Sequence, residues 1–518
     1  MNRNVIGFLA MVVLGTGTLV GLYFALPHLS RMTQKDTSDA GAVGTTLRIG
    51  MDNWVGYVPL CSKELRRQMR SAGFLVQCED DNADTAARMK RLREGSLEFA
   101  VATVDSLLLN GPREKFPGTT VLVIDESSGG DAIVARRDKV ASLQELKTRA
   151  NYKLAFTPGS PSEHLLRSVA VHFDVPALRE RNGTWRVPVK GSQEALKQLQ
   201  AGKVDVAVLW EPDVSRALAD KGMHKLLGTD QTRRLIVDVL LVGREFSRTN
   251  GAAVKQLIDS YFRTLKHFRD NPAALADEVK QVARVDDAQV AAILGGVRWA
   301  TLEENAREWF GVASPWGDSS EGLIDALEST ARILVDSGDM RESPIPERDP
   351  YRLQHRLYVE ELFKSITGAA AQAPGAAKPG AARKFAALSA AQWDGLREIG
   401  TLKVRPITFQ SGSSELNVDG RAEVDAAAQN LRHYPNFRVV VRGHTGTRGD
   451  PESNRELSQE RADTIKRHLL VTHGIDEARV RAVGFGGERP LTRLDSEPDR
   501  AYEYRLPRVE LQMVAESY

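Results

Sequence analysis

"MKRLREGSLEFAVATVDS", residues 89–106, and "LKQLQAGKVDVAVLWEPD", residues 196–213, align on one another without a gap. Each segment predicts a helix that ends at a glycine, Gly95 or Gly202, followed by a buried strand and then by polar residues where the strand ends. One helix–strand unit is therefore used twice, which predicts two similar α/β lobes in one chain.

The sequence around this repeat has the same character. From residue 46 to about 365, short apolar runs such as "TLRIGM" and "YKLAFT" alternate with helical patterns. Strands that alternate with helices favour α/β layers with largely parallel sheets. Open α/β sheets bind ligands beyond the carboxyl ends of their strands, so two such lobes are expected to face a shared cleft.

The residues that follow the predicted strands are the candidates for the lining of this cleft. They are Asp52, Trp54, Tyr57, Thr103, Asp105, Asp131, Ser160, Trp210 and Glu211. Each also has a plain structural alternative: the aromatic side chains suit a core, Asp105 suits a helix cap, and Glu211 suits a helix start.

The charge of these loops indicates a class of ligand. In "TPGSPSEHLL", residues 157–166, Ser160 is expected to cap a helix and Glu163 to reach back to its amide, where it would compete with an anion. The candidate loops carry several carboxylates and no Arg or Lys. We therefore expect a neutral, zwitterionic or cationic solute, which the aromatic rings would suit.

Four segments together resemble a known family: "RIGMDNWVGYVPL", "LREGSLEFAVATVDSLL", "DAIVARRDKVASLQELK" and "LQAGKVDVAVLWEPD". They are similar to the periplasmic solute-binding proteins of ABC transporters, in the group that includes nitrate, sulfonate and thiamine-precursor binders. The resemblance implies a type II-like two-lobed fold, a hinge of crossing strands, a periplasmic location and a possible ABC permease as partner.

Catalysis has no visible apparatus in the sequence. A thiamine-pyrimidine synthase shares this lobe pattern but uses a cysteine-rich motif that is absent here, and neither a Cys/His nucleophile pair nor zinc spacing occurs. We therefore predict no enzyme, no catalytic residue, no cofactor and no metal site. The net charge of +2 gives no electrostatic case for nucleic acid.

The two cysteines, Cys61 and Cys78, both lie in the first part of the large domain. In an oxidising compartment they would close a loop of about 17 residues, worth about 3 kcal/mol in the chain-entropy model. The alternative is a pair of buried thiols.

Residues 5–26 are the one membrane-like segment of the sequence. They form an apolar run of about 22 residues without an ionisable group, long enough for about 33 Å of helix. A cleaved signal peptide is the alternative reading. An uncleaved anchor gives a single-pass inner-membrane protein with residues 1–4 in the cytoplasm, a stalk at 27–45, and the bulk of the chain in the periplasm.

The solute-binding domain, residues 46–365, is followed by a linker and a last domain. Residues 366–385 are rich in Ala, Gly and Pro, a composition that cannot bury a core and predicts a tether, so the last domain is expected to move independently. Residues 386–518 contain strand and helix patterns in the order β-α-β-α-β-β, with the first strand expected in "LKVRPITFQ", which predicts a small α+β sandwich.

Within this domain, "GHTGTRGD", residues 443–450, precedes "NRELSQERADTIKRHLL" and "GFGGERP". This order of motifs resembles the OmpA-like peptidoglycan-binding domain. In that family an aspartate after G-H-T and an arginine in L-S-x-x-R-A hold the ammonium and the carboxylate of diaminopimelate in the wall peptide. The resemblance implies that Arg461 is that arginine, whereas Gly446 stands where the aspartate is expected.

The missing aspartate weakens the expected contact with peptidoglycan. Losing one member of a buried charged contact costs about 2–5 kcal/mol. Asp450 is a candidate for the missing carboxylate, although an Asp before Pro451 also suits a helix N-cap. His444, Thr445 and Asn454 match the motif and are expected to shape the loop.

Together these features predict an inner-membrane-anchored periplasmic protein that binds a small solute between two lobes and contacts the cell wall, as an envelope sensor or scaffold. One alternative is the substrate-capture component of an ABC transporter. A second is that the OmpA-like domain binds a protein partner instead of peptidoglycan.

Overall fold

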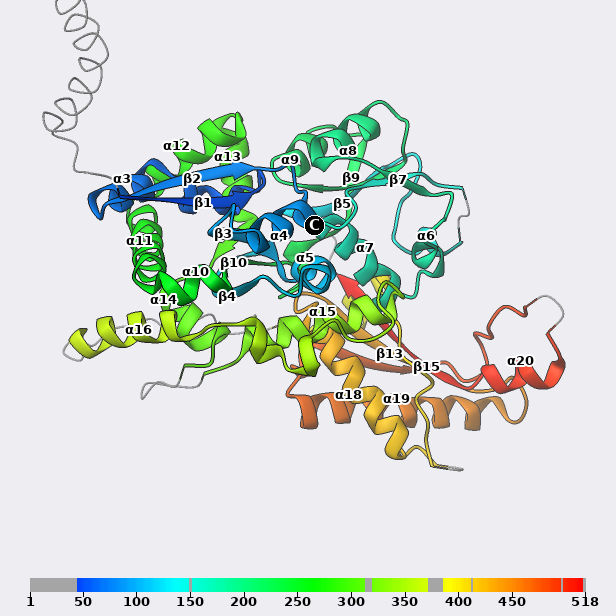
Figure 1. Ribbon diagram of the computed structural model, residues 1–518. Helices are drawn as coiled ribbons and strands as arrows, with labels where there is room; N and C mark the ends of the chain where they lie inside the picture. Colours follow the sequence, from blue (N-terminus) through cyan, green and yellow to red (C-terminus); the bar gives the residue numbers. More distant parts are fainter. Residues whose placement is uncertain are drawn as a thin grey trace, which may run out of the picture.

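The computed structural model describes residues 44–148, 151–312, 319–370, 385–410, 413–494 and 497–515. In these ranges the chain forms two α/β lobes and an α+β domain, each with its own sheet (Figure 1). None of the helices in these ranges is both long enough and apolar enough to cross a membrane. The predicted anchor, residues 5–26, and most of the predicted linker lie outside the described residues.

Lobe 1 is built on a six-stranded sheet in the order β11-β4-β10-β3-β1-β2. Its strands are β1 (Thr45–Met51), β2 (Phe74–Asp80), β3 (Phe99–Thr103), β4 (Gly118–Ser127), β10 (Val237–Gly243) and β11 (Val297–Trp299). Its helices are α2 (Val58–Cys61), α3 (Lys63–Ser71), α4 (Thr85–Arg93), α5 (Val104–Asn110), α10 (Arg244–Thr249), α11 (Gly251–Asp270), α12 (Pro272–Ala283), α13 (Asp287–Gly295), α14 (Leu302–Glu304), α15 (Gly322–Asp336) and α16 (Leu357–Ala370).

Lobe 2 is built on a five-stranded sheet in the order β7-β6-β8-β5-β9. Its strands are β5 (Asp131–Arg136), β6 (Leu154–Phe156), β7 (Arg186–Pro188), β8 (Val206–Trp210) and β9 (Met223–Gly228). Its helices are α6 (Glu145–Thr148), α7 (Pro161–His172), α8 (Gly191–Gln200) and α9 (Asp213–Leu218). The chain enters this lobe between β4 and β5 and leaves it between β9 and β10, so two crossing segments join the lobes.

The predicted repeat is confirmed. Its two copies are α4-β3-α5 in lobe 1 and α8-β8-α9 in lobe 2, and the helix-ending glycines, Gly95 and Gly202, have φ of 72° and 66°. In each lobe three neighbouring strands run parallel (β2-β1-β3 and β7-β6-β8), and the next strand, β10 or β5, runs antiparallel to them. The expectation of largely parallel sheets was therefore wrong in part: the strands next to the crossing segments make both sheets mixed.

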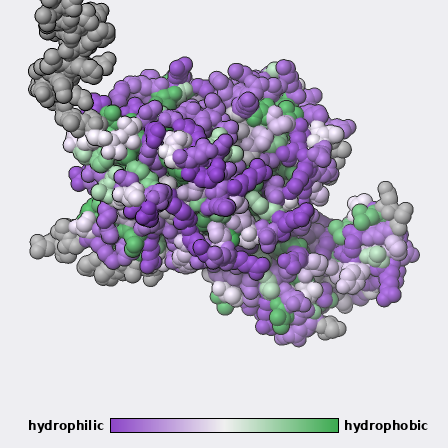
Figure 2. All heavy atoms as spheres, in the orientation of Figure 1, coloured by the Kyte–Doolittle hydropathy of each residue, from purple (hydrophilic) through white to green (hydrophobic). Residues whose placement is uncertain are grey.

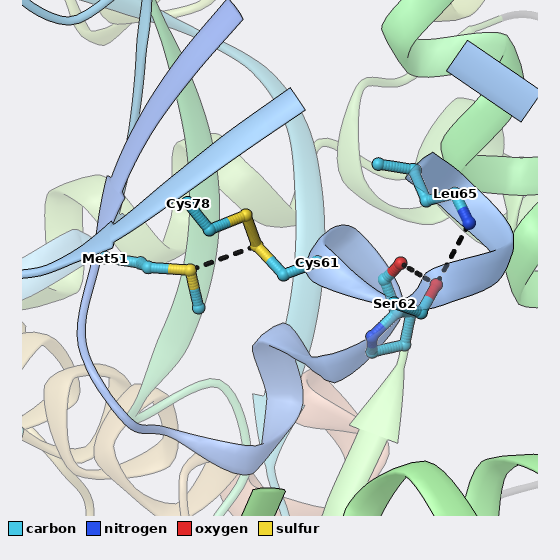
Figure 3. Close-up of a disulfide and its surroundings, with 6 residues drawn as sticks. Met51, Cys61, Ser62, Leu65 and Cys78 are labelled. Carbon is cyan, nitrogen blue, oxygen red and sulfur yellow. Dashed lines mark hydrogen bonds between the residues drawn. A yellow bond between two sulfur atoms is a disulfide. The ribbon is translucent and has the colours of Figure 1, made fainter. Parts of the chain in front are cut away.

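A disulfide joins the start of lobe 1 to its edge strand, as Figure 3 shows. The predicted pairing of Cys61 with Cys78 is present, with 6.3 Å between the Cα atoms. Cys61 ends α2 and Cys78 lies on β2, and the next residue, Ser62, caps α3 by accepting a hydrogen bond from the Leu65 amide. The bond therefore fixes the helix after the first strand to the edge of the sheet.

The carboxyl-terminal domain has a four-stranded sheet in the order β12-β15-β13-β14. Its elements are α17 (Ala390–Asp394), β12 (Arg397–Leu402), α18 (Val418–Arg432), β13 (Arg438–His444), α19 (Pro451–His473), β14 (Val480–Gly484), α20 (Asp499–Arg505) and β15 (Arg508–Ala515). The predicted β-α-β-α-β-β order is confirmed, with α17 and α20 as additions. The first strand was placed too late: it ends at Leu402, before Pro406, which has no amide hydrogen for a ladder.

This domain packs against lobe 2. Buried apolar residues of the two form one continuous cluster. The Tyr434 ring meets Phe173 edge-on at 5.4 Å, and its hydroxyl lies 2.6 Å from His172 Nδ1. A Cβ on Gly400 would stand 2.5 Å from Phe173, and the Lys403 amide donates to the His172 carbonyl. The expected independence of the last domain is therefore corrected, because the tether's composition says nothing about the surfaces it joins.

The apolar side chains are largely withdrawn into these cores. On the face that Figure 2 shows, hydrophilic residues dominate and hydrophobic ones are scattered in small groups. Lobe 1 has a core of its own, to which α11 and α15 contribute. Lobe 2 has one core of its own, against α8 and α9, and shares a second with the carboxyl-terminal domain and with Ile333 of α15.

Candidate functional site

A small cavity lies between the lobes. Its lining combines loops and helix starts of lobe 1 with strand ends of lobe 2 and with β10, which returns from one lobe to the other. The lining residues are Asp52, Trp54, Tyr57, Ala83, Thr85, Arg88, Thr103, Ser106, Asp131, Ser160, Pro161, Trp210, Ile236 and Asp238.

Three buried aromatic side chains line this cavity, and each is held by a hydrogen bond. Trp54 Nε1 donates to Asp125 Oδ1 at 3.2 Å, and the Tyr57 hydroxyl donates to the Asp238 carboxylate. Trp210 Nε1 donates across the cleft to Asn53 Oδ1 at 3.3 Å. The last bond joins lobe 2 to lobe 1, so the cleft is closed on this side.

The backbone comes very close to these rings. A Cβ on Gly56 would stand 2.1 Å from Asp125 Oδ2, and a Cβ on Gly130 would stand 2.2 Å from the Trp54 ring. Glycine is therefore required at both positions, because any side chain there would displace Trp54 or the carboxylate that holds it.

One cation lines the cavity, which corrects the expectation of a lining without Arg or Lys. Arg88, on α4, is buried and pairs with Asp81 at 2.6 Å and with Asp52 at 3.1 Å. Its Nη1 also donates to the Val101 carbonyl at 2.9 Å. Arg88 therefore holds Asp52 in place through an ion pair. The carboxyl groups of the lining, Asp52, Asp131 and Asp238, still outnumber this one cation.

Three further carboxyl groups are buried at the cavity. Burial raises the pKa of Asp131 to about 7, and the charges of Asp105 and Glu211 add to the effect. Burial also raises the pKa of Asp125 and of Asp238, and each of these two charges opposes ionisation of the other. Burial therefore favours the uncharged form of all three carboxyl groups.

Seven of the nine predicted cleft residues line the cavity, and two do not. The Glu211 carboxylate turns to α9, where it accepts hydrogen bonds from the Ser215 amide at 3.1 Å and hydroxyl at 2.8 Å. Asp105 is buried in α5, and its carboxyl oxygens accept no hydrogen bond from the described residues. That the seven bind a ligand stays a prediction.

Ser160 sits as expected at the start of α7, where its hydroxyl accepts from the Ser162 amide at 3.3 Å. Glu163 was expected to reach the Ser160 amide, but it accepts from the Gly159 amide at 2.9 Å and pairs with Arg167 and Arg186. A carboxylate thus occupies this helix start, and the amides there offer little to an anion.

The second candidate site is the loop between β13 and α19. Thr445 donates its amide to Gly486 in the β14–β15 connection, and Asn454 Nδ2 donates to the Arg448 carbonyl at 2.9 Å. His444 is buried against the Phe485 ring. These three predicted residues shape the loop. Asp450 is the N-cap of α19, where its exposed carboxylate accepts from the Ser453 amide at 2.8 Å.

Arg461, on α19, lies over the Phe409 ring at 5.0 Å and is half-buried. Its Nε is buried and meets no hydrogen-bond partner among the described residues. Burial without a counter-charge lowers the pKa of this guanidinium. An unpaired, partly buried arginine of this kind is ready to accept an anionic group.

The space at Gly446 is open. A Cβ there would meet nothing nearer than Glu503 Oε2, at 4.0 Å. Glu503 lies on α20, in the connection from β14 to β15, and its other oxygen is 3.5 Å from Arg448 Nε. The Glu503 carboxylate thus comes near Gly446, the position at which the family has its aspartate.

Comparison with known proteins identifies this domain. The profile of the OmpA family matches residues 408–504. The peptidoglycan-associated lipoprotein of Pasteurella multocida is 38% identical over 104 residues, 20% of this chain and 69% of that protein. That of Rhizobium meliloti (strain 1021) is 35% identical over 89 residues, 17% of this chain and 50% of that protein. The chain belongs to the OmpA family through its carboxyl-terminal domain, and it spans about half the length of several of the curated relatives it matches.

The two-lobed domain is similar to solved solute-binding proteins. The alkanesulfonate-binding protein SsuA from Xanthomonas axonopodis pv. citri bound to MOPS has 18% identity and a TM-score of 0.44, over 57% of this chain and 95% of that one. The periplasmic aliphatic sulphonate binding protein SsuA from Escherichia coli has 17% identity and a TM-score of 0.45, over 60% and 99%. The desulfurization enzyme DSZB is also similar, with 12% identity and a TM-score of 0.42, over 62% and 100%.

Proposed function

We propose that this chain is an envelope protein that captures a small solute between its lobes and associates with peptidoglycan through its OmpA domain, held to the inner membrane by residues 5–26. The observation that carries the first part is the interlobe cavity, lined by three aromatic side chains and several carboxyl groups. Neither a nucleophile pair nor a cofactor enters this proposal, and the chain acts by binding.

The cavity favours a cationic or zwitterionic solute over a free oxyanion. Its one lining cation, Arg88, is already paired with two carboxylates and bonded to a carbonyl, whereas Asp131 and Asp238 form no ion pair with the described residues. Aromatic faces bind cationic groups most strongly when water is excluded, and Trp54 and Trp210 are both buried.

The packing of the OmpA domain on lobe 2 favours a sensor or scaffold. A domain that shares its core with one lobe follows that lobe when the cleft opens or closes. Capture for an ABC permease is the second candidate, supported by the two-lobed fold. Co-purification of a permease with the full chain would favour capture, whereas recovery of wall fragments alone would favour the sensor.

Solute binding is tested on the full chain by native mass spectrometry and by thermal shift against amines, betaines, amino acids, sulfate, nitrate and phosphate. We expect an amine or zwitterion to raise the melting temperature, and Trp54→Ala to weaken its binding at least tenfold, since a desolvated cation–π contact is worth about 2 kcal/mol. Trp393→Ala, outside the cavity, is the control. Stabilisation by the oxyanions alone would reject the proposed ligand class.

For the wall-binding site we propose that Glu503 supplies the missing carboxylate and Arg461 the guanidinium. Asp450 is the poorer candidate, because its oxygen already caps α19. In a pulldown on purified peptidoglycan sacculi, Arg461→Ala and Glu503→Gln are each expected to release the protein. Loss of one partner of a buried charged contact costs about 2–5 kcal/mol, or at least about thirtyfold in affinity.

Two matched variants sharpen this experiment. Asp450→Ser keeps a helix cap and removes the carboxylate, so it should bind as wild type does. Gly446→Asp restores an acid in open space and should rescue Glu503→Gln. Release by Asp450→Ser alone would assign the contact to Asp450. If the wild-type protein itself stays in the supernatant, the domain has a protein partner instead.

A further inference from the structure

The helical side of the OmpA domain carries a cluster of three side chains that neither candidate site uses. Asp425 lies on α18, and His468 and His473 lie near the end of α19. His468 Nε2 is 2.7 Å and His473 Nε2 is 2.6 Å from the same oxygen, Asp425 Oδ1. One ligand atom from each residue lies within 4.8 Å of the other two.

The three side chains converge, so that a single small ion could contact all of them. The two imidazole rings are 5.7 Å apart between centroids and inclined at 60°, so they approach the carboxylate from different directions. Both histidines are largely buried, with side chains 18% and 14% exposed, whereas Asp425 is 43% exposed. The cluster is thus held by the packing of α18 on α19 and stays open to solvent on the Asp425 side.

We propose that Asp425, His468 and His473 form a binding site for a divalent transition-metal ion of the zinc type. Two imidazole nitrogens and one carboxylate oxygen are a donor set that suits zinc, nickel or copper, whereas calcium and magnesium prefer oxygen ligands alone. The fourth position of a tetrahedral ion would face solvent and take a water molecule.

The site needs side-chain adjustments to take the ion. Bonds of about 2.0–2.1 Å in a tetrahedral site place ligand atoms about 3.3 Å apart, so each nitrogen must withdraw from Asp425 by about 0.6–0.7 Å. Rotation of the part-exposed Asp425 side chain can supply this movement, and the two imidazole nitrogens, which lie within 4.8 Å of each other, must approach by up to about 1.5 Å. The ion would then replace the two hydrogen bonds and link the last turn of α19 to α18.

The metal site is separate from the wall-binding residues. On the same helix, Arg461 lies seven positions before His468 and twelve before His473, which is about 10 Å and about 18 Å at 1.5 Å per residue. Loading of the site is therefore expected to stabilise the domain without occupying its wall-binding loop, so the two proposals fail independently.

The test is a titration of the metal-free full chain with Zn²⁺ against a competing chelating indicator, together with the visible spectrum of the Co²⁺ form. We expect one ion per chain, a tetrahedral Co²⁺ spectrum and a rise in melting temperature on adding Zn²⁺. His468→Gln, His473→Gln and Asp425→Asn should each weaken binding at least tenfold, and His224→Gln, on lobe 2, should not.

Glutamine and asparagine keep the size and hydrogen-bonding capacity of the side chains, and circular dichroism without metal checks that each variant is folded. An unchanged affinity in the His468→Gln/His473→Gln double variant would overturn the proposal, because the ion would then be held elsewhere. Absence of binding by the wild-type chain at micromolar Zn²⁺ would overturn it as well.

Discussion

Replacement of Arg88 by methionine is expected to lower the free energy of unfolding by about 3–5 kcal/mol, as measured by urea denaturation of the full chain. The guanidinium is 1% exposed and pairs with Asp52 and Asp81. Methionine fills much of the same space but leaves two carboxylates without their cation in a partly desolvated place. The cost comes from those uncompensated charges.

Two further variants separate this cause from a general loss of packing. Arg67→Met removes an exposed arginine that pairs with Glu64, and it should leave the unfolding midpoint unchanged. Arg88→Met combined with Asp52→Asn and Asp81→Asn removes both uncompensated charges and should recover a large part of the loss. If the triple variant is no more stable than Arg88→Met alone, the pairing of charges is not what makes Arg88 important.

The second large effect is a dependence of stability on pH that Asp131 creates. Its pKa is raised from 3.8 to about 7 in the folded protein, because burial opposes ionisation. A group whose folded pKa is raised contributes stability that is fully present below its unfolded pKa and is lost as the pH rises through the folded pKa. The loss therefore falls between about pH 4 and pH 7, at about 1.4 kcal/mol per unit, or about 4 kcal/mol in total.

The measurement compares wild type with Asp131→Asn, which resembles the protonated acid and does not titrate. As the pH rises from 5 to 7, the wild type should lose stability relative to Asp131→Asn, so the unfolding free energy of the variant minus that of the wild type should increase. Asp138→Asn, which removes an exposed carboxylate of the same lobe, should give a curve parallel to wild type over this range. Parallel curves for Asp131→Asn as well would mean that Asp131 ionises freely in the folded protein.

The cleft was predictable because its residues follow strands in the sequence. The repeat at 89–106 and 196–213 located two strand ends, and Trp54, Thr103 and Trp210 were found from that pattern alone. Seven lining residues were missed, and two of them, Arg88 and Asp238, carry ionisable groups. Arg88 projects from a helix, and Asp238 lies near the start of the strand that returns from lobe 2, so neither follows a strand end in the sequence.

Other contacts depend on which surfaces meet, which no local pattern encodes. Tyr434 and Phe173 have the character of ordinary core residues, and nothing in their neighbourhoods says that they face each other across a domain boundary. The approach of Glu503 to Gly446 joins positions on two separate connections of the OmpA domain. His468 and His473 lie five apart on a helix, and their convergence needs Asp425 from another helix.

The place where the OmpA domain packs has a mechanical consequence. The segment that precedes residue 44 joins the described chain at β1 in lobe 1, whereas the OmpA domain packs on lobe 2. Under the proposed topology the membrane would therefore hold one lobe and the wall the other. A change in the width of the periplasm would load the hinge directly, and the contacts that bridge the lobes, among them Trp210–Asn53, Arg216–Ala283 and Arg167–Asp339, would share that load. Solute binding and mechanical tension would then both change how far the two lobes are open. Stretching of the envelope would therefore change the apparent affinity of the cleft for its solute.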